Sequence, residues 1–489
     1  MFKKYQHIHF VGIGGIGMSG IAEVLLNLNY QVSGSDLKKS ATTRRLKKRG
    51  AKIFLGHHAD HLNGAEVVVT SSAVEENNPE VKKARHLNIP VVPRAEMLAE
   101  LMRMKYGIAI AGTHGKTTTT SMIGTVLSEA GLDPTLIIGG RLNSLKTNAR
   151  LGKGEYLVAE ADESDKSFLK LNPTMAVITN IDPEHMENYK NFSEVKKCFI
   201  NFANKVPFYG AVVACADHPQ VRKIFPELSR RVVTYGIKEK AEYTAKNIEQ
   251  KGASIDFDVL YHGDPLGRIR MSQPGVHHVG NALAAVAIAR ELDIPFSKIA
   301  AGLKKFQGIA RRFEILKEND PMVVDDYAHH PVEIEATIAA AKKGWPDYKI
   351  AVVVQPHRFS RLKFLWDGFV KALGKTDLTI VLPVYAAGEK PIAGITGKNF
   401  FLGLREAHPK LPVAYAESLE EITAVLKPWI GDASEDLALP VRTRGVRGDG
   451  APAERSEVGQ RSPRYQKTLV LFLGAGDITK MARRFVKKC

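Results

Sequence analysis

The chain has 489 residues, of which 44% are hydrophobic and 25% charged, and this composition excludes a collagen-like, a wholly disordered or a disulfide-scaffold protein. At ~100–200 residues per domain, the length predicts about three domains. Lys and Arg outnumber Asp and Glu by 69 to 52, so the net charge is +17. The excess is spread as +7, +4 and +6 over residues 1–106, 107–310 and 311–489. This spread favours a basic surface with sites for anionic small molecules over a nucleic-acid partner.

The three cysteines, Cys198, Cys215 and Cys489, form no CxxC pair and no paired pattern. They therefore indicate neither a zinc site nor a disulfide framework, which fits a reducing compartment. No run approaches the ~18 apolar residues of a membrane span. We expect a cytoplasmic enzyme, a monomer or homodimer, with no membrane partner.

Strand-like apolar runs alternate with helical patterns along almost the whole chain, which indicates α/β architecture with parallel sheets. Three such strands lead into turns of special chemistry: His7–Val11, Tyr106–Ala111 and Met322–Val324. We place domain boundaries near residues 106 and 310. The predicted domains are 1–106, 107–310 and 311–489.

One segment, residues 431–466, breaks this alternation. It is rich in Arg, Gly, Pro and Ser and has no sustained apolar period, so we predict a disordered insertion between the helix Leu419–Leu426 and the strand Thr468–Leu473. An arginine-rich nucleic-acid-binding segment is the alternative. It is disfavoured because Tyr465 is the single aromatic residue in the segment and its six arginines are matched by six acids.

A glycine-rich turn, residues 12–20, follows the first strand and opens a helix predicted over Ile21–Leu28. Glycines let the backbone approach a phosphate closely, and a helix N-terminus offers free N–H groups to the anion. Asp36 closes the next strand, Gln31–Ser35, about 20 residues on, where a dinucleotide site has its ribose-binding acid. The turn predicts either an NAD site or a UDP-sugar site, since both ligands offer a pyrophosphate. A glycine turn without a ligand is the plain alternative.

A second loop, residues 111–120, also joins a strand to a helix and contains Gly115-Lys116-Thr117. In such loops backbone N–H groups cradle phosphates, the lysine reaches the β- and γ-phosphates, and the hydroxyl can bind Mg²⁺. The spacing departs from the standard pattern, because Ile110 stands where that pattern has a glycine, although Gly112 lies closer. We predict ATP binding. Two phosphate loops in successive domains favour a ligase or kinase over a dehydrogenase.

Acidic residues follow the predicted strand Tyr156–Glu160. Its end and the next turn hold four carboxylates: Glu160, Asp162, Glu163 and Asp165. Acids at the carboxyl end of a parallel strand, beside a phosphate loop, are well placed to hold Mg²⁺. His185, after the strand Met175–Thr179, is a candidate metal ligand or phosphate contact. The plain alternatives are a solvated strand exit for the acids and a surface or capping role for His185.

Two arginines follow the predicted strand Ile350–Val354. Arg358 and Arg361 are three residues apart, so we expect them to share a helical face. A pair of guanidinium groups suits the α-carboxylate of an amino acid. A solvated helix start is the alternative.

Together these motifs resemble the Mur ligase family, the ATP-dependent amide ligases of peptidoglycan precursor synthesis. The resemblance runs from about residue 7 to 425 and resumes at 468. The pieces that carry it are GIGGIGMSGIAEVL (12–25), SGSD (33–36), GTHGKTTTT (112–120), EADESD (160–165), TNIDPEHM (179–186), GVHHVGNALAA (275–285), RRFE (311–314), DDYAHHP (325–331) and QPHRFSR (355–361). It implies an N-terminal Rossmann-like UDP-binding domain, a central P-loop ATPase-like domain with a mixed sheet, and a C-terminal Rossmann-like domain for the amino acid.

The resemblance also implies roles for individual residues, which group by ligand. The UDP-sugar contacts would be Gly14, Gly15, Gly17, Asp36, Ser71 and Ser72. The ATP contacts would be Gly112, Thr113, His114, Gly115, Lys116, Thr117, Thr118, His278, Asn281, Arg312 and Asp326, with His278 and Asn281 in a turn entering a helix over Ala282–Arg290. The metal ligands would be Thr117, Glu160 and His185, and the catalytic residues Lys116, Glu160 and His185. The amino-acid contacts would be Tyr327, His329, His357, Arg358 and Arg361.

The implied reaction joins L-alanine to the lactyl carboxylate of UDP-N-acetylmuramate, with ATP and Mg²⁺, through an acyl phosphate. The nucleotide and the amino acid would come from different domains, so domain closure would assemble the site. One alternative is the recycling ligase that adds a tripeptide to the same UDP-sugar. A P-loop regulatory or nucleic-acid-binding protein would leave the acid cluster unexplained, and an NAD-dependent dehydrogenase would leave the phosphate loop unexplained.

Overall fold

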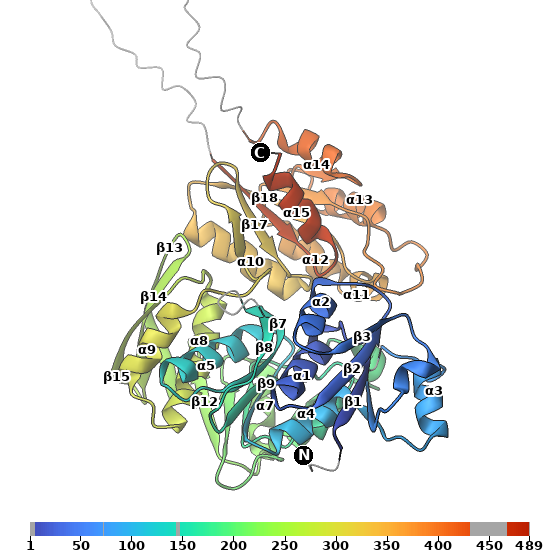
Figure 1. Cartoon of the computed structure of the whole chain (residues 1–489). Helices are drawn as coiled ribbons and strands as arrows, with labels where there is room; N and C mark the ends of the chain where they lie inside the picture. The colour runs from blue at the N-terminus through green and yellow to red at the C-terminus, as the bar shows by residue number, and fades with distance from the viewer. Residues whose placement is uncertain (1–4, 72, 143–146, 431–466, 489) are drawn as a thin grey trace, which may run out of the picture. The chain divides into compact units, whose positions relative to one another are not determined.

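The computed structural model describes residues 5–71, 73–142, 147–430 and 467–488. Two predictions, the insertion at 431–466 and the contact at Ser72, lie outside these residues. The chain divides into two compact units, residues 1–310 and 311–489, which we describe separately (Figure 1). No helix in the described ranges is long and apolar enough to cross a membrane.

The first sheet has five parallel strands in the order β3-β2-β1-β4-β5. Its strands are β1 His7–Val11, β2 Gln31–Asp36, β3 Lys52–Leu55, β4 Val67–Thr70 and β5 Val91–Pro93. Its helices are α1 Ile16–Asn27, α2 Ala41–Lys48, the 3-10 helix η1 Ala59–Leu62, α3 Pro79–His86 and α4 Arg94–Met102. The central strand β1 is buried at every position but His7, as expected of a parallel strand covered on both faces. From β1 the chain adds β2 and β3 on one side and then β4 and β5 on the other, so the strand order reverses between β1 and β4. Ligands bind at this point in such sheets.

The second sheet also belongs to the first unit and has ten strands in the order β15-β14-β13-β12-β11-β10-β6-β9-β7-β8. They are β6 Tyr106–Ala111, β7 Thr135–Leu142, β8 Thr147–Arg150, β9 Tyr156–Glu160, β10 Met175–Ile178, β11 Ala211–Cys215, β12 Val232–Gly236, β13 Tyr243–Lys251, β14 Ser254–Tyr261 and β15 Asp264–Met271. The helices are α5 Lys116–Glu129, η2 Ser167–Lys170, η3 Met186–Asn188, α6 Phe192–Ala203, α7 Pro219–Ile224, η4 Phe225–Glu227, α8 Val276–Glu291 and α9 Phe296–Lys305. Around β6 the strands are parallel, whereas β13, β14 and β15 form an antiparallel strip at one edge (Figure 1). The sheet is mixed, as predicted.

The second unit is built on a six-stranded sheet in the order β16-β17-β21-β18-β19-β20. The strands are β16 Glu314–Lys317, β17 Met322–Asp326, β18 Lys349–Val354, β19 Leu378–Val381, β20 Val413–Tyr415 and β21 Thr468–Leu473. The helices are α10 Pro331–Gly344, α11 Phe359–Phe364, α12 Trp366–Leu373, α13 Gly397–Ala407, α14 Leu419–Leu426 and α15 Ile478–Val486. All strands but β16 run parallel, and β21 is buried at every position. The three sheets confirm the predicted α/β class.

Three predicted boundaries are wrong by two residues or more, each because a helix or strand continues through a motif. The helix α1 begins at Ile16 rather than Ile21, so it takes in Gly17 and Gly20. The helix α8 begins at Val276, directly after Gly275, whose φ of 110° suits glycine. The strand β17 continues through Asp326 because it pairs with the buried strand β21 along that length.

A buried carboxylate links several segments of the first sheet. The side chain of Glu80, in α3, is fully buried. It accepts hydrogen bonds from Ser35 at 2.5 Å and His61 at 2.7 Å, and it lies 3.3 Å from His57 Nδ1 and 3.6 Å from His9 Nε2. Burial alone would raise the pKa of Glu80, but the hydrogen bonds from His9, Ser35 and His61 outweigh it and lower the pKa to about 2.

We expect Glu80→Gln to lower the free energy of unfolding by about 3 kcal/mol at pH 7. Because the folded-state pKa lies below the unfolded value of 4.5, this stabilisation is complete above pH 4.5 and is lost as the pH falls toward 2. Denaturant titrations of the wild type and Glu80→Gln at pH 7 and pH 3.5 measure their free energies of unfolding. The difference between the two free energies should be smaller at pH 3.5. The control is Glu76→Gln, which removes an exposed ion pair with Arg85 and should change the free energy of unfolding very little, because solvent screens exposed pairs. An equal difference at both pH values would contradict the role of the Glu80 charge.

Candidate functional site

The carboxyl ends of β1 and β2 bring the glycine loop and Asp36 together. Asp36 Oδ2 accepts the backbone N–H of Gly14 at 2.9 Å, and Oδ1 accepts that of Lys38 at 3.1 Å. A Cβ on Gly14 would lie 2.6 Å from Asp36 Oδ2, so this approach requires glycine. Asp36 therefore supports the loop directly, in addition to any ligand contact.

The other predicted UDP-sugar residues that the structure describes, Gly15, Gly17 and Ser71, lie on the same edge of the sheet. Gly15 is the N-cap of α1, and its backbone N–H donates to Gly12. Ser71 follows β4, the neighbour of β1 opposite β2, and is half-buried. Gly17 lies against the guanidinium of Arg94, since a Cβ on Gly17 would come within 2.7 Å of Arg94 Nη1. Arg94 was not identified from the sequence, because no motif contains it.

The phosphate loop is held by the residues that follow β10. Thr179 Oγ1 and Asn180 Nδ2 donate to the carbonyl of His114, at 2.6 and 3.0 Å. The backbone N–H of His114 donates to Asn180 Oδ1 at 2.7 Å. Gly112 has a φ of 139°, and a Cβ there would lie 2.0 Å from Thr179 Oγ1. Gly112 therefore lets the loop pack tightly against the residues that follow β10.

Lys116 contacts both the backbone of the phosphate loop and the acid cluster. Its Nζ donates to the carbonyls of Gly112, at 2.5 Å, and Thr113, at 3.3 Å, and contacts Glu163 at 2.8 and 2.9 Å. Burial alone would lower the pKa of Lys116, but the carboxylates of Glu163, Asp162 and Glu160 outweigh it and raise the pKa. The lysine is therefore charged at neutral pH. Three acids of the predicted cluster act on this one ammonium group.

The remaining ATP residues of the first unit lie around this loop. Thr117 and Thr118 belong to the first turn of α5, and Thr113 Oγ1 accepts the backbone N–H of Asp182 at 2.9 Å. Asn281 lies beside Gly115, because a Cβ there would come within 2.8 Å of Asn281 Oδ1. His278 is one turn before Asn281 on α8, with a nitrogen 3.4 Å from Asn281 Nδ2. Both residues are therefore near the phosphate loop, although inside a helix rather than in a turn.

The predicted metal ligands differ in how the structure places them. Glu160 ends β9, and its Oε1 accepts the backbone N–H of Gly139 at 2.5 Å. His185 has a φ of 56° and lies 3.7 Å from Glu187. Among the residues that the structure describes, no three His, Cys, Asp or Glu side chains form a ready metal site. The donor chemistry still suits Mg²⁺, because three carboxylates face a single lysine and leave an excess of negative charge and oxygen ligands.

In the second unit, Asp326 is a buried structural acid. Its Oδ2 accepts the backbone N–H of Phe313 and its Oδ1 that of Ala328, each at 2.7 Å. Burial raises the pKa of Asp326 to about 6. Arg312 lies over the ring of Tyr327, 5.1 Å from its centroid, and 3.7 Å from Glu333.

Four of the five predicted amino-acid residues form one aromatic and cationic group. The rings of Tyr327 and His329 are 5.2 Å apart, and His329 meets His357 edge to face at 5.7 Å. Arg361 Nη1 is 3.0 Å from His357 Nδ1. Burial, with the nearby His329 and Arg361, lowers the pKa of His357 to about 3, so the imidazole is neutral. The His357 ring stacks on the ring of Tyr385, with the two centroids 5.6 Å apart. Tyr385 was not identified from the sequence as part of the site.

The prediction that Arg358 and Arg361 share a helical face is wrong. Arg358 is the N-cap of α11 with a φ of 69°, outside the helix, whereas Arg361 lies inside it. The backbone N–H of Arg358 donates to the carbonyl of Tyr385, which holds this turn. Arg358 Nε lies 4.0 Å from Glu389, a second residue that sequence reasoning missed. Spacing alone could not show that the helix begins one residue after Arg358.

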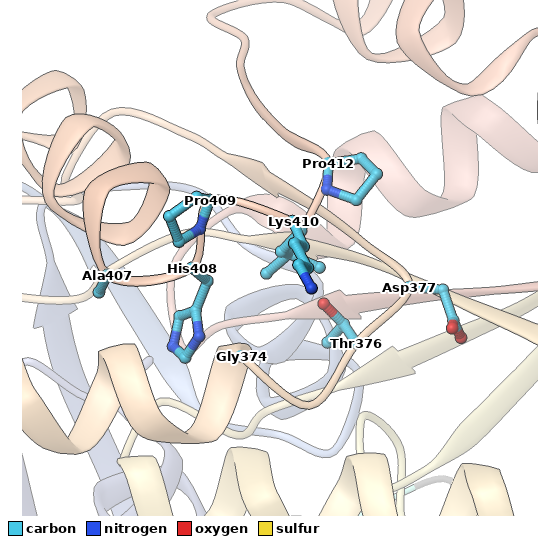
Figure 2. A pocket seen from close by; sticks show the side chains of 9 residues that line it. Gly374, Thr376, Asp377, Ala407, His408, Pro409, Lys410 and Pro412 are labelled. Carbon is cyan, nitrogen blue, oxygen red and sulfur yellow. The ribbon is translucent and has the colours of Figure 1, made fainter.

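A surface hollow in the second unit lies away from these residues (Figure 2). It is lined by Gly374, Thr376, Asp377, Ala407, His408, Pro409, Lys410, Leu411 and Pro412. Asp377 and Pro412 directly precede β19 and β20, so the hollow lies at the amino ends of these parallel strands. His357 follows the carboxyl end of β18, at the opposite edge. None of the predicted site residues lines this hollow.

Comparison with known families places these observations in one framework. Residues 7–106 match the model described as Mur ligase family, catalytic domain. Residues 110–289 match the Mur ligase middle domain, and residues 311–437 match the Mur ligase, glutamate ligase domain. The glycine loop, the phosphate loop and the cluster around His357 fall one in each match.

Individual relatives of known name are similar to this chain over most of its length. The UDP-N-acetylmuramate–L-alanine ligase of Geotalea uraniireducens (strain Rf4) is 54% identical over 433 residues, which cover 88% of this chain and 94% of that protein. The corresponding ligase of Syntrophotalea carbinolica is 53% identical over 447 residues, 91% and 97% of the two chains. The crystal structure of UDP-N-acetylmuramate-alanine ligase from Thermotoga maritima superimposes with a TM-score of 0.77 at 30% identity, covering 99% of this chain and 98% of that one. With three successive family matches and relatives of this identity and coverage, the chain belongs to the Mur ligase family.

Proposed function

We propose that this chain joins L-alanine to the lactyl carboxylate of UDP-N-acetylmuramate with ATP, releasing ADP and phosphate, as a cytoplasmic monomer or homodimer of peptidoglycan precursor synthesis. The observation that carries the proposal is the phosphate loop, where Lys116 Nζ lies within 2.9 Å of Glu163 and acts with the acids that follow β9. The relatives named for this reaction, at 53 and 54% identity, support the choice of substrates. The three domains, with boundaries near 106 and 310, would hold the UDP-sugar, ATP and the amino acid.

The first step activates a carboxylate, which is a poor acyl donor, as an acyl phosphate. The γ-phosphoryl group carries its negative charge on oxygens that need fixed positive partners, and the buried ammonium group of Lys116 supplies one. Mg²⁺, held by Thr117, Glu160 and His185, would neutralise further charge on the transferred group. Asn180, through its bonds to His114, keeps the loop in shape for the phosphates.

The second step is attack of the uncharged amine of alanine on the acyl phosphate, and the tetrahedral intermediate collapses with loss of phosphate. Arg358 and Arg361 would bind the α-carboxylate of alanine by charge-assisted hydrogen bonds. His357 stays neutral and is held by Arg361 and Tyr385, so it packs beside the arginines without adding a charge.

Phosphate release measured with ATP and UDP-N-acetylmuramate tests the proposal. L-alanine should support turnover at least about tenfold faster, in kcat/KM, than glycine or L-serine, because a pocket discriminates such small changes by roughly 1–3 kcal/mol. Omission of the UDP-sugar is the control for ATPase activity without a substrate. Release with the tripeptide L-Ala-γ-D-Glu-meso-diaminopimelate and none with L-alanine would contradict the proposal and favour the recycling ligase.

A further inference from the structure

The glycine loop and the acid cluster meet at one cation, Arg94. Arg94 is the first residue of α4, and its guanidinium is partly buried. Nη1 lies beside Gly17 of the glycine loop, where a Cβ would be 2.7 Å away. Nη2 donates to Asp162 Oδ2 at 3.1 Å. One side chain therefore contacts both the loop proposed for a pyrophosphate and the acids beside the phosphate loop.

The charge of the glycine loop explains why a cation is needed there. Residues 12–20 contain no Lys or Arg, so the loop itself offers a phosphate only backbone N–H groups and the partial positive charge of a helix N-terminus, equivalent to about half a unit charge. A pyrophosphate carries more negative charge than this. A guanidinium group binds phosphate oxygens with a planar fork of donors, and Arg94 Nη1 lies beside Gly17 in the first turn of α1.

The second contact of Arg94 points to a link between the two sites. Asp162 is an anion already held by the same guanidinium. It directly precedes Glu163, the carboxylate partner of Lys116. A pyrophosphate at the glycine loop and the carboxylate of Asp162 would therefore draw on the positive charge of one guanidinium group.

We propose that Arg94 binds the pyrophosphate of the nucleoside-diphosphate sugar and divides its guanidinium between that group and Asp162. The inference rests on the proposed function for the identity of the sugar nucleotide, but not for the binding of the diphosphate. It predicts opposite effects for the two variants that break the same ion pair. Loss of the guanidinium removes a pyrophosphate contact, whereas loss of the Asp162 charge removes a competitor.

Isothermal calorimetry of the full chain with UDP, and separately with uridine, tests this. Arg94→Gln should weaken UDP binding by about 10- to 100-fold, as expected for a lost charge-assisted contact, and Arg94→Lys should recover part of it. Asp162→Asn should tighten UDP binding about threefold or more, in line with removal of a partly exposed ion-pair partner. Uridine, which lacks phosphate, should bind all variants within about twofold of the wild type.

Lys170→Gln is the matched control. Lys170 Nζ pairs with Glu96 Oε2 at 3.1 Å, so this pair joins the same helix α4 to the segment just after the acid cluster. Its loss should leave UDP affinity unchanged. If Asp162→Asn weakens UDP binding as Arg94→Gln does, the ion pair has a structural role and the inference is overturned. Wild-type UDP affinity in Arg94→Gln would overturn it as well.

The same measurements separate this inference from the proposed function. UDP binding needs no turnover, so opposite shifts in the two variants would uphold the role of Arg94 even if L-alanine supported no phosphate release. Turnover with L-alanine, combined with unchanged UDP affinity in Arg94→Gln, would uphold the function and overturn the inference. Failure of the wild-type chain to bind UDP would overturn both.

Discussion

Lys116→Ala is expected to lower kcat for ATP-dependent phosphate release by about a thousandfold while UDP-N-acetylmuramate still binds. Lys116 supplies the buried positive charge at the centre of the phosphate loop, and removal of one such donor from a preorganised site costs about 10²–10³-fold in rate. The loss also leaves Glu163, a carboxyl group whose pKa burial raises, without its ammonium partner. Phosphate release measures kcat, and calorimetry measures the binding of UDP-N-acetylmuramate.

Lys105→Ala is a matched control for removal of a partly buried lysine. Lys105 Nζ donates to backbone carbonyls, that of Gly152 at 2.9 Å and that of Gly154, and has no contact with the phosphate loop among its described hydrogen bonds. Its loss should reduce stability with little change in kcat per folded molecule. Undiminished turnover by Lys116→Ala would contradict the assignment of the loop, and so would a loss of UDP-sugar binding equal to the loss of turnover.

The sequence predicts the strands of this fold better than the limits of its motifs. β1, β6, β21 and α14 begin and end where their apolar patterns indicate, because buried parallel strands and capped helices leave strong local signals. Helix α8 begins earlier than predicted, since the glycine at 280 is tolerated inside a helix that packs on the sheet. In such helices, packing against the sheet outweighs the low helix propensity of glycine. A single sequence does not show which residues will be buried in this way.

The residues of the candidate site likewise fall into those that the local sequence indicates and those that only the structure brings together. Loop residues such as Gly112 and Lys116 could be predicted because their chemistry depends on near neighbours in sequence. The ion pairs Arg94–Asp162 and Lys116–Glu163 could not, since they join residues 68 and 47 positions apart that carry no shared motif. Glu389 likewise meets Arg358 only through the fold. Motifs therefore indicate the loops that we propose for the ligands, whereas the charged partners of these loops could be found only in the structure.

Arg358→Ala is expected to raise the KM for L-alanine by about 10- to 100-fold and to leave the KM for ATP within about twofold. A hydrogen bond to a charged group contributes about 1.5–3 kcal/mol, which corresponds to this range. Arg358 is held at the start of α11 by its backbone bond to Tyr385 rather than by helical packing, so its truncation should spare the fold. Initial rates at varied L-alanine and varied ATP measure both constants.

Two further variants distinguish recognition of the carboxylate from a general change of charge. Lys363→Ala removes an exposed cation from the same helix and should change neither KM. Arg358→Lys keeps the charge but loses the planar fork, so its KM for L-alanine should lie between those of the wild type and Arg358→Ala. Because His357 is neutral, with a pKa of about 3, its own titration should not alter the KM for L-alanine between pH 6 and 8. Equal rises in the KM of ATP and of L-alanine in Arg358→Ala would show that Arg358 organises the second unit and does not bind the amino acid.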